Sequence, residues 1–257
     1  MQKPTQKKTS GRFSIVQQYV RGRWFNPRTM ARYQGYLLTG NPDHLFQAKK
    51  LHARVYLRRN FIAMKDVTAE GVMTDTSDPH QYVSTYFVIC DQTQDPQPVV
   101  VSARQIHTLA SNRHDELPIM NEADIYQSKK DEIQRYAAAD CVEISGLVKH
   151  TGHPTLPVLM VYRLMWQYSV QSRHKIWLMA CDPALYARLK YFFGDAIERI
   201  GNDTPYVGAD VVPAMLKIDE AIIRLKQQSK TLMPIRRGMN KTILEFFQDP
   251  EDILVLK

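Results

Sequence analysis

The fold of this chain is decided by the stretch CVEISGLV at residues 141–148. Its apolar and β-branched residues predict a strand that carries one carboxylate, Glu143. Strict alternation gives this strand two faces, with Glu143, Ser145 and Leu147 on one and Val142, Ile144 and Gly146 on the other. A carboxylate on a half-buried face loses hydration, which raises its pKa. We expect Glu143 to be either a general base for an ammonium group or a structural residue, paired with an arginine or placed at the sheet edge.

The chain alternates helix and strand after this stretch. Residues 156–172 predict a helix that is apolar on nearly all faces, as is typical of a helix buried between layers. Residues 175–180 predict a strand, and Asp182 and Pro183 predict the cap and first turn of a helix that ends at Gly194. The remaining predicted elements are strands at 197–200 and 211–218 and helices at 219–228 and 240–248.

The residues before the stretch add three helices and a hairpin. Asn26-Pro27 predicts a short helix to about Leu38, and the apolar spacing from Asp43 predicts a longer one to about Arg59. The later predicted elements are strands at 82–90 and 99–106, joined by a proline-containing connection, and a short helix at 128–136. Together the elements predict an α+β fold, a central mixed sheet with helices on both faces.

The positive charge is concentrated at the front of the chain. The net charge is +8, and residues 1–42 contain no acid but eight cations: Lys3, Lys7, Lys8, Arg12, Arg21, Arg23, Arg28 and Arg32. We therefore expect a basic N-terminal extension at 1–42 and a single domain with C-terminal helices at 43–257. Such an extension attracts an anionic surface, whether nucleic acid, acidic lipid or an acidic carrier protein.

Several classes of protein are excluded by what the sequence lacks. It has no apolar run of about 18 residues and no secretory leader, so we expect a cytoplasmic protein. Attachment to an anionic membrane surface through the basic extension and the amphipathic residues 13–25 is an alternative. No GxGxxG, P-loop, HExxH or GxSxG motif is present. His150 and His153 have no third ligand at a usual spacing, so we expect no metal site.

A second charge, Arg104, lies inside the predicted strand at 99–106. A guanidinium group binds a carboxylate through two parallel hydrogen bonds. Arg104 is thus a candidate to hold a substrate carboxylate, or to be the structural partner of Glu143.

Five segments carry a resemblance because they occur in a fixed order. They are residues 99–106 with Arg104, Leu117-Pro118-Ile119, residues 142–148, residues 177–186, and Tyr206-x-Gly208 followed by Val212-Pro213. Over about residues 45–217, this series resembles the GNAT-fold N-acyl amino acid synthases and their relatives, the acyl-homoserine-lactone synthases.

The resemblance implies a GNAT-like (acyl-CoA N-acyltransferase) fold and transfer of a fatty acyl group from acyl carrier protein to the amine of an amino acid or similar metabolite. It implies Glu143 as the catalytic residue and Arg104 and Ser145 as substrate-binding residues. No cofactor is expected to stay bound, because acyl-carrier protein, or acyl-coenzyme A, is the acyl donor. An apolar acyl channel is expected near the aromatic helix segment 159–168; Met160, Met165, Trp166 and Met179 are candidate lining residues, although core packing explains such a stripe more often.

Two local features keep other functions open. The arginine that follows Glu-x-Ser in the family is Gly146 here, which is compatible with a non-catalytic binding module on a degenerate acyltransferase fold. The turn at 150–155 has one glycine, and Pro154 has no N–H to donate, so the pyrophosphate of coenzyme A finds few main-chain donors. This favours a carrier protein as donor, with a coenzyme A-dependent GNAT acetyltransferase as the alternative. Nucleic-acid binding is not expected, because no recognition motif accompanies the charge.

Overall fold

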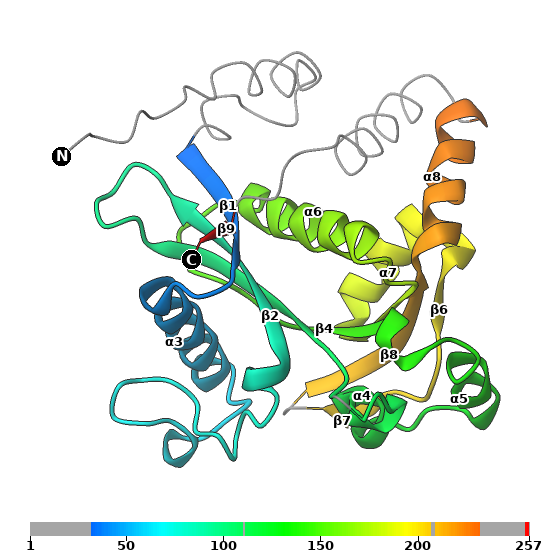
Figure 1. Ribbon diagram of the computed structural model, residues 1–257, viewed down its shortest axis with the longest axis horizontal. Coiled ribbons are helices and arrows are strands. Elements are labelled where there is room, and N and C mark those ends of the chain that lie inside the picture. Colours follow the sequence, from blue (N-terminus) through cyan, green and yellow to red (C-terminus); the bar gives the residue numbers. More distant parts are fainter. Residues whose placement is uncertain (1–31, 110, 207–208, 232–254, 257) are drawn as a thin grey trace.

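The computed structural model describes residues 32–109, 111–206, 209–231 and 255–256, which form a central sheet flanked by helices (Figure 1). The strands are β1 (Tyr33–Leu38), β2 (Ser84–Asp91), β3 (Val99–Ile106), β4 (Cys141–Lys149), β5 (Ile176–Cys181), β6 (Ile197–Arg199), β7 (Thr204–Tyr206), β8 (Ala209–Lys217) and β9 (Val255–Leu256). The α-helices are α3 (Pro42–Arg58), α4 (Pro118–Glu122), α5 (Gln127–Ile133), α6 (Leu156–Gln171), α7 (Pro183–Phe193) and α8 (Ile218–Thr231).

The sheet is mixed, with the strand order β6-β8-β5-β4-β3-β2-β1-β9 and β7 paired to β8. Strands β1, β2, β3 and β4 lie side by side in chain order, and each is antiparallel to the next of these four. β4 and β5 are parallel, because the chain crosses over through α6 between them, and β8 returns antiparallel to β5. The predicted mixed sheet is therefore confirmed, and β4, the strand that carries Glu143, lies in its middle.

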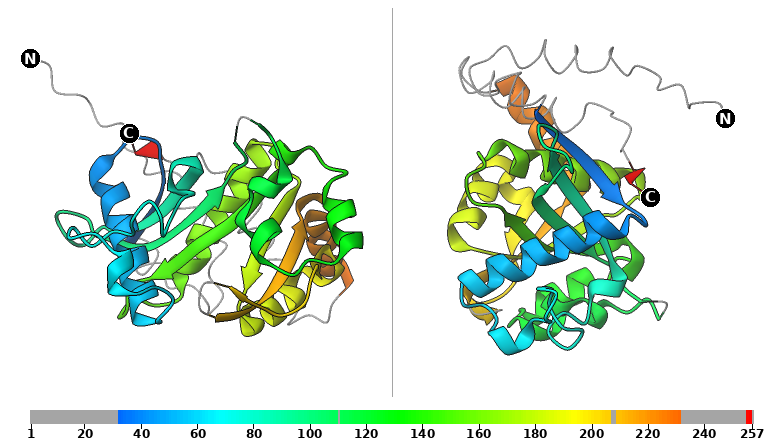
Figure 2. Two further views of the ribbon diagram at one scale, coloured as in Figure 1. Left: turned by 90° about the horizontal axis from the view of Figure 1, so that it is seen from below. Right: turned by 90° about the vertical axis from the view of Figure 1, so that its left-hand side faces the viewer.

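Helices cover both faces of the sheet (Figure 2). The two faces separate along β2, since Phe87 and Ile89 belong to the core beneath α6 and α7, whereas Tyr86 and Val88 belong to the core beneath α3. Successive residues of a strand point to opposite faces, so α3 and α6 lie on opposite sides. A third cluster joins α4 and α5 to the face that α3 shares; Ile119, Ile133, Cys141 and Leu178 are among its members.

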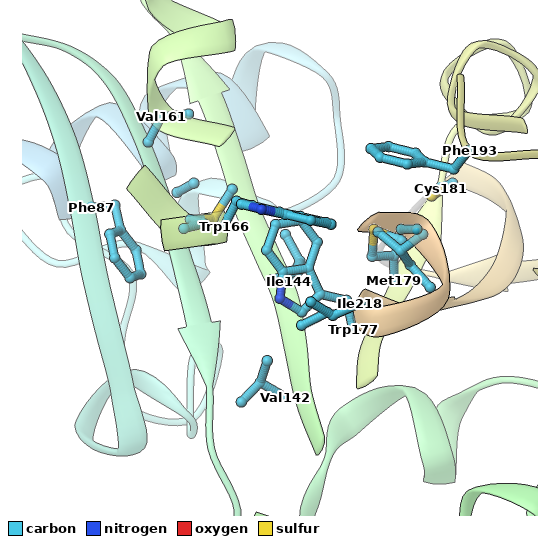
Figure 3. Packing of buried hydrophobic residues seen from close by; sticks show 14 of the residues in the cluster. Phe87, Val142, Ile144, Val161, Trp166, Trp177, Met179, Cys181, Phe193 and Ile218 are labelled. Carbon is cyan, nitrogen blue, oxygen red and sulfur yellow. The ribbon is translucent and has the colours of Figure 1, made fainter. Parts of the chain in front are cut away.

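The largest core cluster is built around Trp166 of α6 (Figure 3). Its ring stacks on Phe193 with centroids 6.0 Å apart and meets Trp177 edge-on at 5.6 Å. Trp166 and Met165 are both buried in this cluster. Core packing therefore accounts for Met165 and Trp166, two of the four candidate residues for the channel lining.

Helix α7 begins as the sequence predicts, whereas α3 begins one residue before the predicted start at Asp43. Asn41 caps α3 by accepting a hydrogen bond from the His44 amide at 2.9 Å, and Pro42 occupies the first turn. Asp182 caps α7 by accepting from the amides of Ala184 and Leu185. Each of these helices begins within a few residues of the strand that precedes it, α3 after β1 and α7 after β5.

The helix predicted to run to Leu38 is wrong, because residues 33–38 form β1 at the side of β2. Buried residues alternate along β1, and Gly35 lets α6 come close, since a Cβ there would lie 2.5 Å from Leu164 Cδ1. The predicted boundary at residue 42 thus falls after the first strand of the sheet. Residues 27–31 of that predicted helix, the predicted helix at 240–248 and most of the basic extension lie outside the described residues.

The predicted helix at 219–228 is confirmed as α8, whereas α4 and β7 were not predicted. Both of these missed elements prove to contact Glu143. Among the described residues, no helix combines the length and the apolar character that crossing a membrane requires.

Candidate functional site

The middle of β4 is irregular on both of its sides. Toward β3, Arg104 faces Ser145 and Ser102 faces Val148, so that Ala103 alone opposes Gly146 and Leu147. This is a β-bulge, and Gly146 has φ +61°, a backbone conformation that glycine adopts without strain. Toward β5, the pairing covers only Cys141–Ile144. Beyond Ile144 the two parallel strands separate, and no strand among the described residues pairs with this edge of β4.

The bulge corrects the predicted alternation. Leu147 does not share a face with Glu143: it packs against the core beneath α6, and Val148 packs against the core beneath α3. The extra residue at Gly146 shifts the side-chain alternation by one, which reverses the face of every residue after it.

A cavity of about 440 Å³ opens where β4 and β5 separate. This volume falls within the range of about 300–1,000 Å³ that is usual for small-molecule sites. The described residues that line it are Val55, Tyr56, Arg59, Phe61, Glu143, Ile144, Ser145, Gly146, Leu147, Val148, Tyr162, Met179, Ala180, Cys181, Asp182, Leu185, Tyr206, Ala209, Asp210 and Val211. Glu143 and Ser145, two of the three predicted site residues, are therefore together in its wall.

The carboxylate of Glu143 is buried, with 1% of the residue exposed. Oε2 accepts a hydrogen bond from the Ile119 amide at 2.8 Å, and Oε1 accepts one from the Tyr206 hydroxyl at 2.9 Å. Burial raises the pKa of Glu143 to about 7, although both hydrogen bonds and the charge of Arg104 favour its ionised form. Glu143 can thus exchange a proton near neutral pH, as a general base must.

Tyr206 is a contact of Glu143 that the sequence analysis did not select. It belongs to β7, which pairs with the start of β8 next to the cavity. Burial and the neighbouring charge of Glu143 raise the pKa of Tyr206. The phenol therefore keeps its proton and acts as a hydrogen-bond donor. The only signal in the sequence was its place in the Tyr206-x-Gly208 segment of the resemblance.

Arg104 is buried beside the site and is paired with Asp78. Its Nη1 donates to both carboxylate oxygens of Asp78 at 2.7 Å and lies 3.3 Å from the Tyr86 hydroxyl. Arg104 is not among the described residues that line the cavity. The sequence suggested Glu143 as a structural partner of Arg104, but the partner in the structure is Asp78. Asp78 lies in the long connection between α3 and β2, where no sequence pattern marked it.

Gly146 separates the cavity from a packed pair of side chains. A Cβ at this position would lie 3.3 Å from His52 Cε1 and 3.6 Å from Arg104 Nε. Burial and the charge of Arg104 lower the pKa of His52 to about 3, so its ring is neutral. The space beside Gly146 is thus occupied by His52 and Arg104.

The two histidines considered for a metal lie on the turn after β4. Their rings are 5.6 Å apart, and His153 Nδ1 lies 3.0 Å from the Tyr33 hydroxyl. No group of three or more His, Cys, Asp or Glu side chains suited to a metal ion occurs in the part of the chain that the structure describes.

Comparison with known proteins finds likeness only at the level of structure. No family model and no curated protein matches the sequence. FeeM, an N-acyl amino acid synthase from uncultured soil microbes, superposes with a TM-score of 0.56 at 10% identity over 75% of this chain and 94% of FeeM.

Two acyl-homoserine lactone synthases show a similar likeness. LasI has a TM-score of 0.52 at 15% identity over 72% of this chain and 89% of LasI. BjaI, a coenzyme A-dependent synthase with SAM and isopentyl-CoA, has a TM-score of 0.51 at 11% identity over 76% of this chain and 89% of BjaI. These likenesses confirm the predicted GNAT-like fold.

Proposed function

From the shared fold, we propose that this chain is an N-acyltransferase that moves a fatty acyl group from acyl carrier protein to the amine of an amino acid or similar metabolite. The observation that carries the proposal is the carboxylate of Glu143, which lies in the wall of a cavity and has a pKa raised to about 7. FeeM, which shares the fold, is an N-acyl amino acid synthase.

The reaction needs a base because an ammonium group is not a nucleophile. Glu143 accepts one proton from the ammonium, and the free amine attacks the carbonyl carbon of the acyl thioester. The C–N bond forms, the C–S bond breaks, and the nitrogen passes its second proton to the released thiolate, which leaves as the thiol. Tyr206 and the Ile119 amide hold the carboxylate in place meanwhile, and Ser145 faces the same cavity as a polar contact for substrate.

The acyl chain is assigned to the apolar part of the cavity between β4 and β5. Ile144, Leu147, Met179 and Leu185 line this part. Met179 is the one residue of the predicted channel set that lies there. An extended chain between the separated strands would also cover the unpaired edge of β4.

The choice of donor rests on charge and on the turn after β4. The basic residues of 1–42 suit an acidic carrier protein, and Pro154 removes a main-chain donor from the turn that would face a pyrophosphate. BjaI is described as coenzyme A-dependent, so acyl-coenzyme A is the second candidate donor. A cytoplasmic location belongs to the same proposal, and attachment to an anionic membrane is the alternative role of the extension.

The experiment is to incubate the full chain with acyl-carrier protein or acyl-coenzyme A and a panel of amines, and to detect N-acyl products by mass spectrometry. We expect product with the carrier-bound donor, a loss of at least about a hundredfold in Glu143→Gln, and no change in Glu70→Gln, an exposed control. Product from neither donor would refute the proposal and favour a binding module.

A second comparison tests the carrier. Deleting residues 1–23 should lower kcat/KM for acyl-carrier protein and weaken its salt dependence, because the encounter loses electrostatic steering, while the reaction with acyl-coenzyme A stays nearly unchanged. If the deletion instead abolishes binding to anionic vesicles and spares the carrier kinetics, the extension serves a membrane.

A further inference from the structure

Acidic side chains outnumber basic ones in the wall of the cavity. Among the described lining residues, Glu143, Asp182 and Asp210 are acidic, whereas Arg59 is the single Lys or Arg. Asp182 is occupied as the cap of α7, where it accepts from the amides of Ala184 and Leu185. A substrate that carries a carboxylate into this cavity thus has one cationic side chain to meet it.

Arg104 is not available for that role. Both oxygens of Asp78 bind its Nη1 at 2.7 Å, and its Nε is buried without a hydrogen-bond partner among the described residues. A substrate carboxylate would have to displace a buried carboxylate to reach the guanidinium group, which leaves Asp78 as an uncompensated charge.

Arg59 is placed by the end of α3. Its amide donates to the Val55 carbonyl at 3.0 Å, and the Phe61 amide donates to the Tyr56 carbonyl at 2.9 Å. The rings of Tyr56 and Phe61 meet edge-on at 5.4 Å, so both side chains that flank Arg59 in the cavity wall are fixed against each other. The main chain of Arg59 is therefore held in position.

The Arg59 side chain itself is exposed. No hydrogen bond or ion pair joins its guanidinium group to another described residue. Its fork of N–H donors is thus free to bind a planar carboxylate through two hydrogen bonds.

We propose that Arg59 binds the carboxylate of the acceptor, and that the acceptor is consequently an amino acid rather than a simple amine. This inference rests on the proposed function. The ammonium group of the acceptor is directed toward Glu143 and its carboxylate toward Arg59, while Arg104 supports the wall through Asp78. Arg59, and not Arg104, sets the preference for a carboxylate.

The test compares an amino acid with its own carboxamide as acceptors, because the two differ in charge but hardly in shape. We expect the wild-type kcat/KM to favour the acid. Arg59→Gln should reduce that preference roughly tenfold to a hundredfold, the usual effect of a hydrogen bond to a charged group, through a loss of kcat/KM for the acid alone. Arg59→Lys should fall between, since an ammonium cannot bind through two parallel bonds.

Arg58→Gln is the matched control. Arg58 precedes Arg59, is also exposed, and its Nη1 lies 3.4 Å from Thr151 Oγ1, so this variant removes the same charge from the same helix end. The preference should stay unchanged in it. An unchanged preference in Arg59→Gln, or an equal loss in Arg58→Gln, overturns the assignment to Arg59.

The failure of this inference is distinguishable from that of the proposed function. If the wild-type chain acylates no amine, the proposed function has failed before any variant is compared. Binding of the acid and of the carboxamide, measured by calorimetry without an acyl donor, gives a readout that does not need turnover. Equal affinity of the wild-type chain for the two acceptors would overturn the role of Arg59 even if acylation occurs.

Discussion

The hydroxyl group of Tyr206 donates a hydrogen bond to Oε1 of Glu143 at 2.9 Å, and thereby ties the hairpin of β7 and β8 to the middle strand of the sheet. The Ile119 amide occupies Oε2 in the same way. Each carboxylate oxygen offers more than one lone pair, so Glu143 can still accept a proton from a substrate while both contacts persist.

The first prediction concerns the pH dependence of acyl transfer. In the wild-type chain, kcat/KM should rise with pH through a midpoint near 7, the pKa to which burial raises Glu143, because only the ionised form accepts a proton. Tyr206→Phe removes a donor to the ionised form, so the pKa of Glu143 rises and the midpoint moves to higher pH. A midpoint that stays in place in Tyr206→Phe would show that this hydrogen bond does not set the pKa of the base.

The second prediction is a pH-dependent stability that needs no assay of activity. A carboxyl group whose pKa is about 7 when folded and about 4.5 when unfolded binds more protons in the folded state between these values. Its contribution is complete below pH 4.5 and is lost as the pH rises toward 7, with a slope of at most about 1.4 kcal/mol per pH unit.

The measurement is urea denaturation of the wild-type chain and of Glu143→Gln at several pH values. His52, whose pKa is lowered to about 3, works in the opposite direction but is present in both proteins. The difference between their free energies of unfolding therefore isolates Glu143. It should shift in favour of Glu143→Gln from pH 4.5 to 7, and a constant difference would contradict the raised pKa.

The third prediction tests the ion pair of Arg104 and Asp78. Asp78→Asn removes the carboxylate that pairs with a buried guanidinium group, which should lower the free energy of unfolding by about 3–5 kcal/mol. The double variant Asp78→Leu, Arg104→Met removes both charges and should recover much of this loss. Chemical denaturation measures both, and a cost below about 1 kcal/mol for Asp78→Asn would show that the pair is solvated.

The fourth prediction concerns the bulge at Gly146. Gly146→Ala places a Cβ in a left-handed conformation, at a cost of about 1–2 kcal/mol, and sets it 3.3 Å from His52. Gly152→Ala is the control, because Gly152 also has positive φ but nothing lies within 4 Å of its added Cβ. Gly146→Ala should be the more destabilising in a thermal melt. Equal costs would mean that His52 moves aside freely.

The sequence was informative wherever a pattern is local. Glu143 and Ser145 could be placed in one strand because apolar and β-branched residues surround them, and the cap of α7 could be read from Asp182. The pairing of β1 could not be predicted from the sequence, because its register depends on β2, which lies about fifty residues away along the chain.

The missed parts of the site share one physical cause. Asp78 contacts Arg104 of β3 and Tyr206 contacts Glu143 of β4, each from a segment distant along the chain, so the contacts that make them important exist only in the folded state. The reversed face of Leu147 was missed because a bulge interrupts an alternation that each residue type alone would continue.

The short pairing between β4 and β5 has a consequence for how the molecule opens. The sheet has two panels, one of β1–β4 and one of β5, β6 and β8, and the four residue pairs between β4 and β5 form the joint between them. By contrast, seven residue pairs join β2 to β3. On the face opposite α3, the joint is reinforced by α6, whose Trp166 packs in one core with Phe87 and Trp177. The two panels of the sheet should therefore exchange their amide hydrogens as separate cooperative units, and a ligand wedged between them would slow exchange on both sides of the joint at once.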